Sequence, residues 1–266
     1  MSYDLLIPLI AALPLAGFAF SALFGRRLQA TFGIRAASLV PVTVVVLAWA
    51  TAMAVCAAVL TGAEPFGHSG HGVLLFQWIP AGDFSVDAGF YVDALTACLL
   101  IVVTTIGMLV HIYSLGYMSH DAGYWRFFAY LNLFMFSMLL LVLADSLLLV
   151  FVAWELVGLS SYLLIGFWYK KRSAALAAKK AFLVNRVGDV GFALGIMGVF
   201  LTFGTLNIRE VLSRAAPLPG ERTLLADARG RFLADPLVKA TSFVPVRLLG
   251  KPQSWTEELT HEPVAS

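Results

Sequence analysis

A single acidic residue interrupts a long apolar stretch near the middle of the chain. Residues 146–168 are long enough to cross a bilayer as one helix, and Glu155 is the only charged residue among them. At about 1.5 Å rise per residue, Glu155 lies about 13 Å below one face of a hydrocarbon layer of about 30 Å, near its midplane. Inserting a carboxylate there costs about 3 kcal/mol unless it is paired, protonated or hydrated. Glu155 is therefore a candidate functional residue.

A second apolar stretch, residues 178–203, brings more charges to a similar depth. Since it enters the membrane from the opposite face, Arg186 is expected about 12 Å and Asp189 about 16 Å from its start. The two are three residues apart and share a helix face. They either neutralise each other inside the bundle or form, with Glu155 and Lys180, a hydrated charged line. We favour the line, because buried ionisable groups in membrane proteins usually mark ion or proton paths.

Histidines and cysteines give little indication of further chemistry. His111 lies near one end of an apolar stretch and is either an interfacial or hydrogen-bonded structural side chain or a functional group. His68 and His71 lie in a glycine-rich loop that offers no third ligand, so no metal site is expected. The two cysteines lie inside apolar segments, which argues against a disulfide framework or a cysteine-ligated cluster.

The composition of the chain identifies an integral membrane protein. Of the 266 residues, 60% are hydrophobic and 13% charged, and the mean hydropathy is far above that of a soluble globular domain. The N-terminal segment has no basic residue before its apolar run, so the first helix is expected to be retained rather than cleaved as a signal peptide. The net charge of +2 gives no indication of a nucleic-acid partner, and none is expected.

The fold class predicted from the apolar pattern is all-α, a polytopic bundle of about six transmembrane helices followed by a polar tail. All seven cations between these helices lie in the first, third and fifth connections, so the positive-inside rule predicts that these are cytoplasmic and that the N-terminus is outside. The transmembrane domain is predicted to span residues 1–207 and the tail residues 208–266. The predicted helices lie at about residues 5–24, 37–60, 88–114, 127–143, 146–168 and 178–203.

Several longer motifs resemble one family of membrane subunits. HIYSLGYM (111–118), RFFAYLNLF (126–134), the stretch 145–168, and KKAFLVNRVGDVGFALG (179–195) followed by FGTLN occur in the order and spacing of that family. They are similar to subunit L, or chain 5, of proton-translocating NADH-quinone oxidoreductase (respiratory complex I). The resemblance spans roughly residues 1–208, and subunits of multisubunit cation/proton antiporters share much of it.

The resemblance implies a membrane-arm subunit that carries protons across the membrane while partner subunits transfer electrons from NADH to quinone. FMN, iron–sulfur clusters and quinone are expected in those subunits, and no cofactor in this chain. Glu155 matches the protonatable glutamate of the family's fifth helix, and Lys180, Arg186 and Asp189 match charged residues of its sixth. The implied partners are the other subunits of the complex, membrane lipids and protons. The Ala-rich composition and the Arg-containing loops favour a bacterial plasma membrane as the location. The alternatives are a subunit of a cation/proton antiporter, or a truncated inactive fragment.

The tail departs from the family pattern. Family members continue through a seventh helix, whose lysine pairs with the glutamate of the fifth, and through a second repeat and a lateral helix. Residues 208–266 contain no apolar run of membrane length but six of the eleven prolines and eight of the eighteen basic residues. This composition predicts a polar, partly disordered tail. Our hypothesis is that it comes from a truncated or frame-shifted reading of a longer gene.

Overall fold

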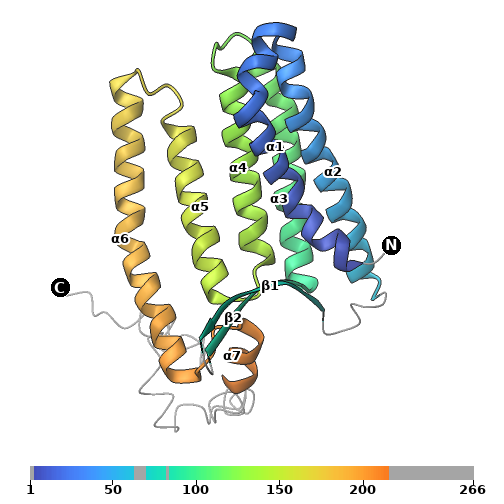
Figure 1. Cartoon of the computed structure of the whole chain (residues 1–266), viewed down its shortest axis with the longest axis vertical. Coiled ribbons are helices and arrows are strands. Elements are labelled where there is room, and N and C mark those ends of the chain that lie inside the picture. Colours follow the sequence, from blue (N-terminus) through green and yellow to red (C-terminus); the bar gives the residue numbers. More distant parts are fainter. Residues whose placement is uncertain (1–2, 63–69, 82–83, 216–266) are drawn as a thin grey trace, which may run out of the picture. The chain divides into compact units, whose positions relative to one another are not determined.

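The computed structural model describes residues 3–62, 70–81 and 84–215, and its six long helices confirm the predicted membrane bundle (Figure 1). Each of the six is long and apolar enough to cross a membrane. A two-stranded hairpin and one short helix accompany them. The elements are α1 (Tyr3–Phe32), α2 (Ile34–Leu60), β1 (His71–Ala81), β2 (Phe84–Val92), α3 (Ala94–Tyr117), α4 (Tyr124–Leu143), α5 (Leu147–Ile165), α6 (Arg172–Phe203) and α7 (Ile208–Ala215).

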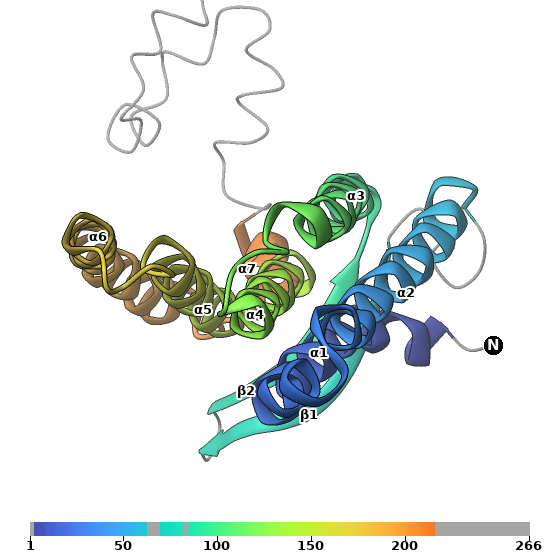
Figure 2. The ribbon, with the colours of Figure 1, turned by 90° about the horizontal axis from the view of Figure 1, so that it is seen from above.

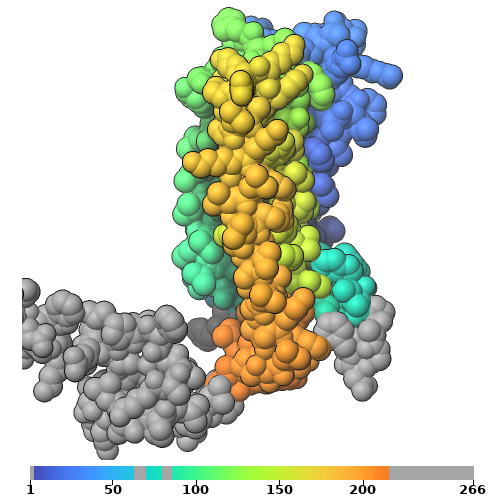
Figure 3. Space-filling model, turned by 90° about the vertical axis from the view of Figure 1, so that its left-hand side faces the viewer, coloured from blue at the N-terminus to red at the C-terminus, as the bar shows by residue number. Residues whose placement is uncertain are grey.

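The helices pack mainly against their sequence neighbours, with α1 also lying against α4. Seen from above, α6 lies beyond α5, away from α1 and α2 (Figure 2). The largest cluster of buried apolar side chains lies among the first four helices and includes Ile7, Val45, Leu100 and Leu139. By contrast, α6 buries little within this chain and lies on the face that Figure 3 shows. Val187 and Leu201 on it are 78% and 84% exposed. In a bilayer such apolar surface faces lipid or another membrane helix.

The connections between helices are segregated by charge. The α1–α2, α3–α4 and α5–α6 connections lie at one end of the bundle, and the hairpin and the α4–α5 turn lie at the other (Figure 1). We call these the basic end and the hairpin end. The seven cations that the sequence places between the predicted helices lie at or beside the connections of the basic end. They are Arg26, Arg27, Arg35, Arg126, Lys170, Lys171 and Arg172.

The hairpin corrects the predicted start of the third helix. The sequence predicts helix from Ala88, but residues 88–92 belong to β2, which pairs antiparallel with β1 from His71↔Val92 to Ala81↔Phe84, and α3 begins at Ala94. Two local signals explain the difference. Asp93 caps α3 by accepting a hydrogen bond from the backbone N–H of Thr96 at 2.8 Å. Before it, buried apolar side chains alternate with period two, as in a strand: Val86, Ala88, Phe90 and Val92.

Helix ends also extend beyond the predicted spans. The first helix continues to Phe32 instead of about residue 24, and the sixth begins at Arg172 instead of residue 178. The added turns carry cations, so apolar content alone underestimates these helices.

A short β-like segment at the α4–α5 turn joins the hairpin to the chain after α6. The backbone N–H of Asp145 donates to Gly89 O (3.1 Å), and its carbonyl accepts from the N–H of Ile208 (3.0 Å). The carboxylate of Asp145 accepts two hydrogen bonds from the Arg209 guanidinium, at 3.2 and 3.1 Å, and Arg209 also lies 4.6 Å from the centre of the Tyr91 ring. Residues 208 and 209 are thus bound to the bundle, although the sequence predicts a polar tail from residue 208.

The compact unit that contains the bundle ends at Arg209, and a second unit begins at Glu210. The described part of the second unit is the remainder of α7, where Arg214 pairs with Glu210 at 3.7 Å. The tail hypothesis otherwise concerns residues 216–266, which lie outside the described residues.

We predict that Arg209→Gln lowers the stability of the hairpin end. The substitution removes two charge-assisted hydrogen bonds to a carboxylate that is only 11% exposed, but Arg209 itself is half exposed, so we expect a loss of about 1 kcal/mol. Thermal unfolding of the detergent-solubilised chain measures this as a drop of a few degrees in midpoint. Arg214→Gln, which alters the exposed pair on α7, is the matched control. An equal midpoint for both variants would contradict the prediction.

Candidate functional site

The structure brings three of the four predicted charged residues together between α5 and α6. Glu155 lies in the middle of α5 and Arg186 in the middle of α6, and the Arg186 guanidinium forms an ion pair with the Glu155 carboxylate. The same guanidinium nitrogen lies 3.5 Å from the Asp189 carboxylate, one turn further along α6. Arg186 therefore bridges one carboxylate on each helix, and we call these three residues the charge cluster.

A tryptophan that the sequence does not single out completes the surroundings of Asp189. The indole N–H of Trp154 donates to Asp189 Oδ1 at 3.0 Å, and the Asp189 side chain is only 8% exposed. Arg186 lies 4.6 Å from the centre of the Phe182 ring, a cation–π arrangement. A signal for Trp154 was available: it precedes Glu155 in an apolar helix, where an indole N–H needs an acceptor.

The charge cluster is unbalanced by one negative charge. Two carboxylates share one guanidinium, so the formal charge is −1 when both carboxylates are ionised. An uncompensated charge is costly within the apolar part of a membrane. Binding of one proton, or approach of one further cation, makes the cluster neutral. The arrangement is therefore chemically suited to take up and release a proton.

Lys180 does not join the charge cluster. It is exposed on α6 and forms no ion pair with Glu155 or Asp189 in the described structure. The reason is helical geometry: six residues at about 100° each place Lys180 about 120° around the helix from Arg186. Lys179, seven residues before Arg186, lies on nearly the same face but about 10 Å nearer the basic end. A role for Lys180 in proton transfer stays a prediction.

The histidines lie elsewhere. His111 is buried, with Nδ1 2.7 Å from Gly107 O and Nε2 3.2 Å from the side-chain nitrogen of Asn132, so it is a hydrogen-bonded core residue and not an interfacial one. His71 Nε2 lies 2.6 Å from Asp4 Oδ1. His68 is outside the described residues. Within the described ranges, no three His, Cys, Asp or Glu side chains are grouped as a metal site would require.

Comparison with known families places this geometry in context. Residues 78–128 match the model of the N-terminus of NADH-ubiquinone oxidoreductase (complex I) chain 5. Residues 144–240, which include the whole charge cluster, match the model of the transmembrane region of NADH:quinone oxidoreductase and Mrp antiporters. The chain belongs to the antiporter-like family that contains complex I chain 5 and the Mrp antiporter subunits. The second match continues past residue 208, where the sequence motifs suggested that the resemblance ends.

Individual relatives agree with the family models. NADH-quinone oxidoreductase subunit L of Mycobacterium tuberculosis (strain CDC 1551 / Oshkosh) is 48% identical over 208 residues, which is 77% of this chain and 31% of the relative. Subunit L of Pseudomonas aeruginosa is 43% identical over 78% of this chain and 33% of its own length. The chloroplastic NAD(P)H-quinone oxidoreductase subunit 5 of Mesostigma viride is 56% identical over 52% of this chain and 21% of its own length. The chain thus spans about a third or less of each of these relatives.

The fold is also similar to that of a solved structure. A chain of the membrane-bound sulfane sulfur reductase, an archaeal respiratory membrane complex, superimposes with a TM-score of 0.64 over 81% of this chain and 40% of the other. At 17% sequence identity, this similarity supports the helix arrangement alone. The chain is a multi-pass membrane protein with the antiporter-like fold.

Proposed function

We propose that this chain is a membrane-arm subunit of a proton-translocating NADH-quinone oxidoreductase, and that the charge cluster carries the proton. The observation that supports this most directly is the bridge from Arg186 to two carboxylates halfway along two apolar helices. Ionisable groups are expensive at that depth and usually serve ion or proton transfer. The relatives named as oxidoreductase subunits supply the class of complex.

The proposed proton carrier is Glu155. When ionised, Glu155 is held by Arg186; when protonated, it loses most of that attraction, and Arg186 is left with Asp189, whose second donor is Trp154. Proton uptake by Glu155 therefore moves the preferred position of the Arg186 guanidinium away from α5 and towards Asp189 on its own helix, α6. Conversely, a conformational change that draws Arg186 towards Asp189 favours protonation of Glu155. This coupling lets electron transfer elsewhere in a complex drive a proton step here.

The proposed partners are the other subunits of the complex, which would hold FMN, the iron–sulfur clusters and the quinone. The little-buried apolar surface of α6 is of the kind that contacts lipid or a neighbouring membrane helix. The proposed location is a bacterial plasma membrane with the basic end in the cytoplasm, because the loop cations gather at that end.

A second candidate function is a subunit of a cation/proton antiporter without redox partners. The matched transmembrane model covers both classes, so the charge cluster suits either. The two functions differ in the subunits with which the chain associates in the membrane.

Purification from native membranes with a C-terminal tag tests the proposal. We expect co-purification with subunits that contain flavin and iron–sulfur clusters, visible as NADH-dependent dye reduction in a native gel. Intact mass spectrometry then compares the chain with the expected 28.8 kDa. A complex that contains this chain but neither flavin nor iron would support the antiporter instead.

A further inference from the structure

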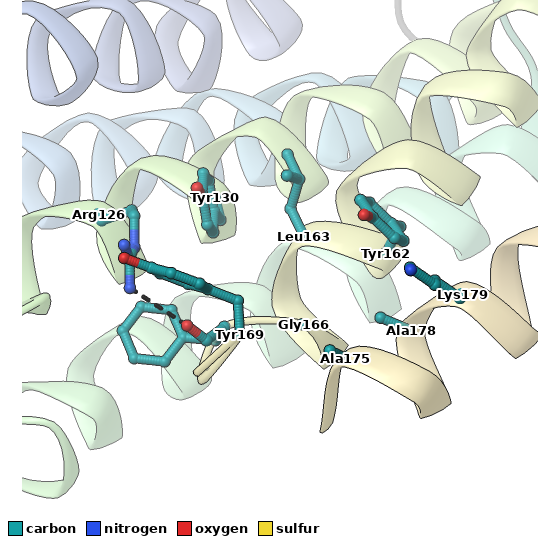
Figure 4. A pocket seen from close by; sticks show the side chains of 10 residues that line it. Arg126, Tyr130, Tyr162, Leu163, Gly166, Tyr169, Ala175, Ala178 and Lys179 are labelled. Atoms are coloured by element: carbon teal, nitrogen blue, oxygen red, sulfur yellow. Dashed lines mark hydrogen bonds between the residues drawn. The ribbon is translucent and has the colours of Figure 1, made fainter. Parts of the chain in front are cut away.

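A pocket opens at the basic end, away from the charge cluster. It has a volume of about 200 Å³ and lies between α4, α5, the α5–α6 connection and the first turns of α6 (Figure 4). Part of the lining is apolar, with Leu163 from α5 and Ala175 and Ala178 from α6. The rest of the lining includes two cations and three tyrosines, namely Arg126, Lys179, Tyr130, Tyr162 and Tyr169.

Arg126 is fixed at one side of the pocket by aromatic and backbone contacts. Its Nη2 donates to the carbonyl of Phe167 at 3.1 Å, and its guanidinium lies 4.9 and 5.1 Å from the centres of the Phe167 and Tyr169 rings. Its Nε is buried and has no hydrogen-bond partner among the described residues. The Arg126 side chain also lines the pocket, so its permanent positive charge is available to an anion there.

Lys179 supplies the second cation from α6, on the other side of the pocket (Figure 4). It reaches this position because it shares the helix face of Arg186, which is turned towards α5. Its neighbour Lys180 does not line the pocket. Adjacent lysines of equal charge therefore have different surroundings.

No carboxylate lines the pocket, and the basic end is short of acids. Asp121 is the only Asp or Glu in the sequence ranges 25–36, 115–126 and 166–180. Its oxygens already accept hydrogen bonds from the Trp168 indole N–H (2.9 Å) and from the backbone N–H of Gly123 (2.7 Å). The Trp168 hydrogen bond holds the pKa of Asp121 below its usual value, and the charge of the Arg126 guanidinium adds to this, so Arg126 has one carboxylate near it outside the pocket lining. The two pocket cations therefore have no acidic partner within the pocket.

We propose that this pocket binds a phosphate group, either in the headgroup of an anionic phospholipid or as free phosphate. A guanidinium and an ammonium on opposite sides of the pocket, with three tyrosines lining the same space, match the negative charge and the acceptor oxygens of phosphate. The volume is several times the roughly 30 Å³ that a water molecule occupies, which leaves room for a phosphate group. The apolar part of the lining and the position at the membrane boundary also suit the glycerol and first methylenes of a lipid.

Native mass spectrometry of the detergent-purified full chain tests the proposal, using Lys179→Gln and the matched control Lys180→Gln. After removal of native lipid, phosphatidylglycerol, phosphatidylcholine or inorganic phosphate is added separately. We expect Lys179→Gln to bind the anionic probe about fivefold more weakly than the parent chain, and Lys180→Gln to bind it nearly as well. Lys179→Arg, which keeps the charge, is expected to restore binding and shows that loss is not due to misfolding.

The added probes separate the two sources. Binding of phosphatidylglycerol that exceeds that of both other probes supports a lipid headgroup, and equal binding of inorganic phosphate supports a free phosphate. Equal weakening by Lys179→Gln and Lys180→Gln would overturn the proposal, since it would indicate general attraction to a basic surface. Absence of binding by any probe to the parent chain would overturn it as well.

Discussion

Glu155→Gln is expected to reduce NADH-driven proton uptake into inverted membrane vesicles by at least about tenfold. Glutamine keeps the size of the side chain and can still accept a hydrogen bond from Arg186, but it cannot exchange a proton. Positioned acid–base groups commonly contribute about 100-fold or more to the rate of a proton transfer. Quenching of a pH-sensitive acridine dye measures the uptake, and Glu155→Asp is expected to retain part of it.

The control for Glu155→Gln is a carboxylate outside the charge cluster. Asp87 is exposed on β2, so Asp87→Asn removes an equal charge without touching α5 or α6. Proton uptake should be nearly normal in Asp87→Asn. The amount of the chain in the membrane should be equal for the parent chain, Glu155→Gln and Asp87→Asn. If the Gln variant pumped as fast as the parent, Glu155 would be a structural polar residue and the proposed mechanism would be wrong.

The second large effect is expected from Arg186→Gln, which should lower the amount of assembled chain in the membrane about fivefold or more. Removing the guanidinium leaves two carboxylates, Glu155 and Asp189, without their shared cation in apolar surroundings. Breaking a fully buried ion pair from one side costs about 3–5 kcal/mol, and we expect a smaller cost here because the Arg186 side chain is 41% exposed. Quantitative immunoblotting of washed membranes measures the loss. Arg186→Lys should have a smaller effect, because an ammonium keeps the charge but cannot fork between two carboxylates as well.

A double variant separates charge balance from packing. Arg186→Gln together with Glu155→Gln has the formal charge of the native cluster, −1, so its level in the membrane should recover above that of Arg186→Gln alone. Arg172→Gln, an exposed cation at the start of α6, is the matched control and should accumulate normally. If the double variant accumulated no better than the single one, the role of Arg186 would lie in its contact with the Phe182 ring and not in charge pairing.

Together these variants distinguish a proton carrier from a structural ion pair. A carrier at Glu155 predicts normal assembly with lost transport for Glu155→Gln, whereas a structural pair predicts lost assembly for both Glu155 and Arg186 variants. The outcome does not depend on the phosphate pocket, which lies at the basic end and is lined by neither residue.

The predictions that came from sequence succeeded where the signal is local. The length of the apolar stretches identified the six membrane helices. The predicted placement of the loop cations in the first, third and fifth connections agrees with the position of these connections at one end of the bundle. The three-residue spacing of Arg186 and Asp189 correctly indicated a shared face on α6. The start of the third helix was wrong, because overall apolar content outweighed the period-two alternation and the Asp93 cap that mark the strand before it.

Other features depend on residues that the chain brings together from a distance. Arg209 reaches Asp145 across 64 residues, and no pattern in either segment indicates the pair. Lys179 and Lys180 are adjacent residues of the same type. The orientation of α6 against α5 places Lys179, but not Lys180, at the pocket. The same orientation gives Asp189 its hydrogen bond from Trp154.

The sequence by itself determined that this protein crosses the membrane several times, which connections carry the cations, and that charged residues lie in the middle of apolar stretches. These follow from length, hydropathy and helical periodicity, which are properties of each segment alone. Only the tertiary structure decided that Arg186 of α6 meets Glu155 of α5. The physical reason is that an ion pair requires contact within about 4 Å, and helix rotation and packing, not spacing along the chain, set that distance.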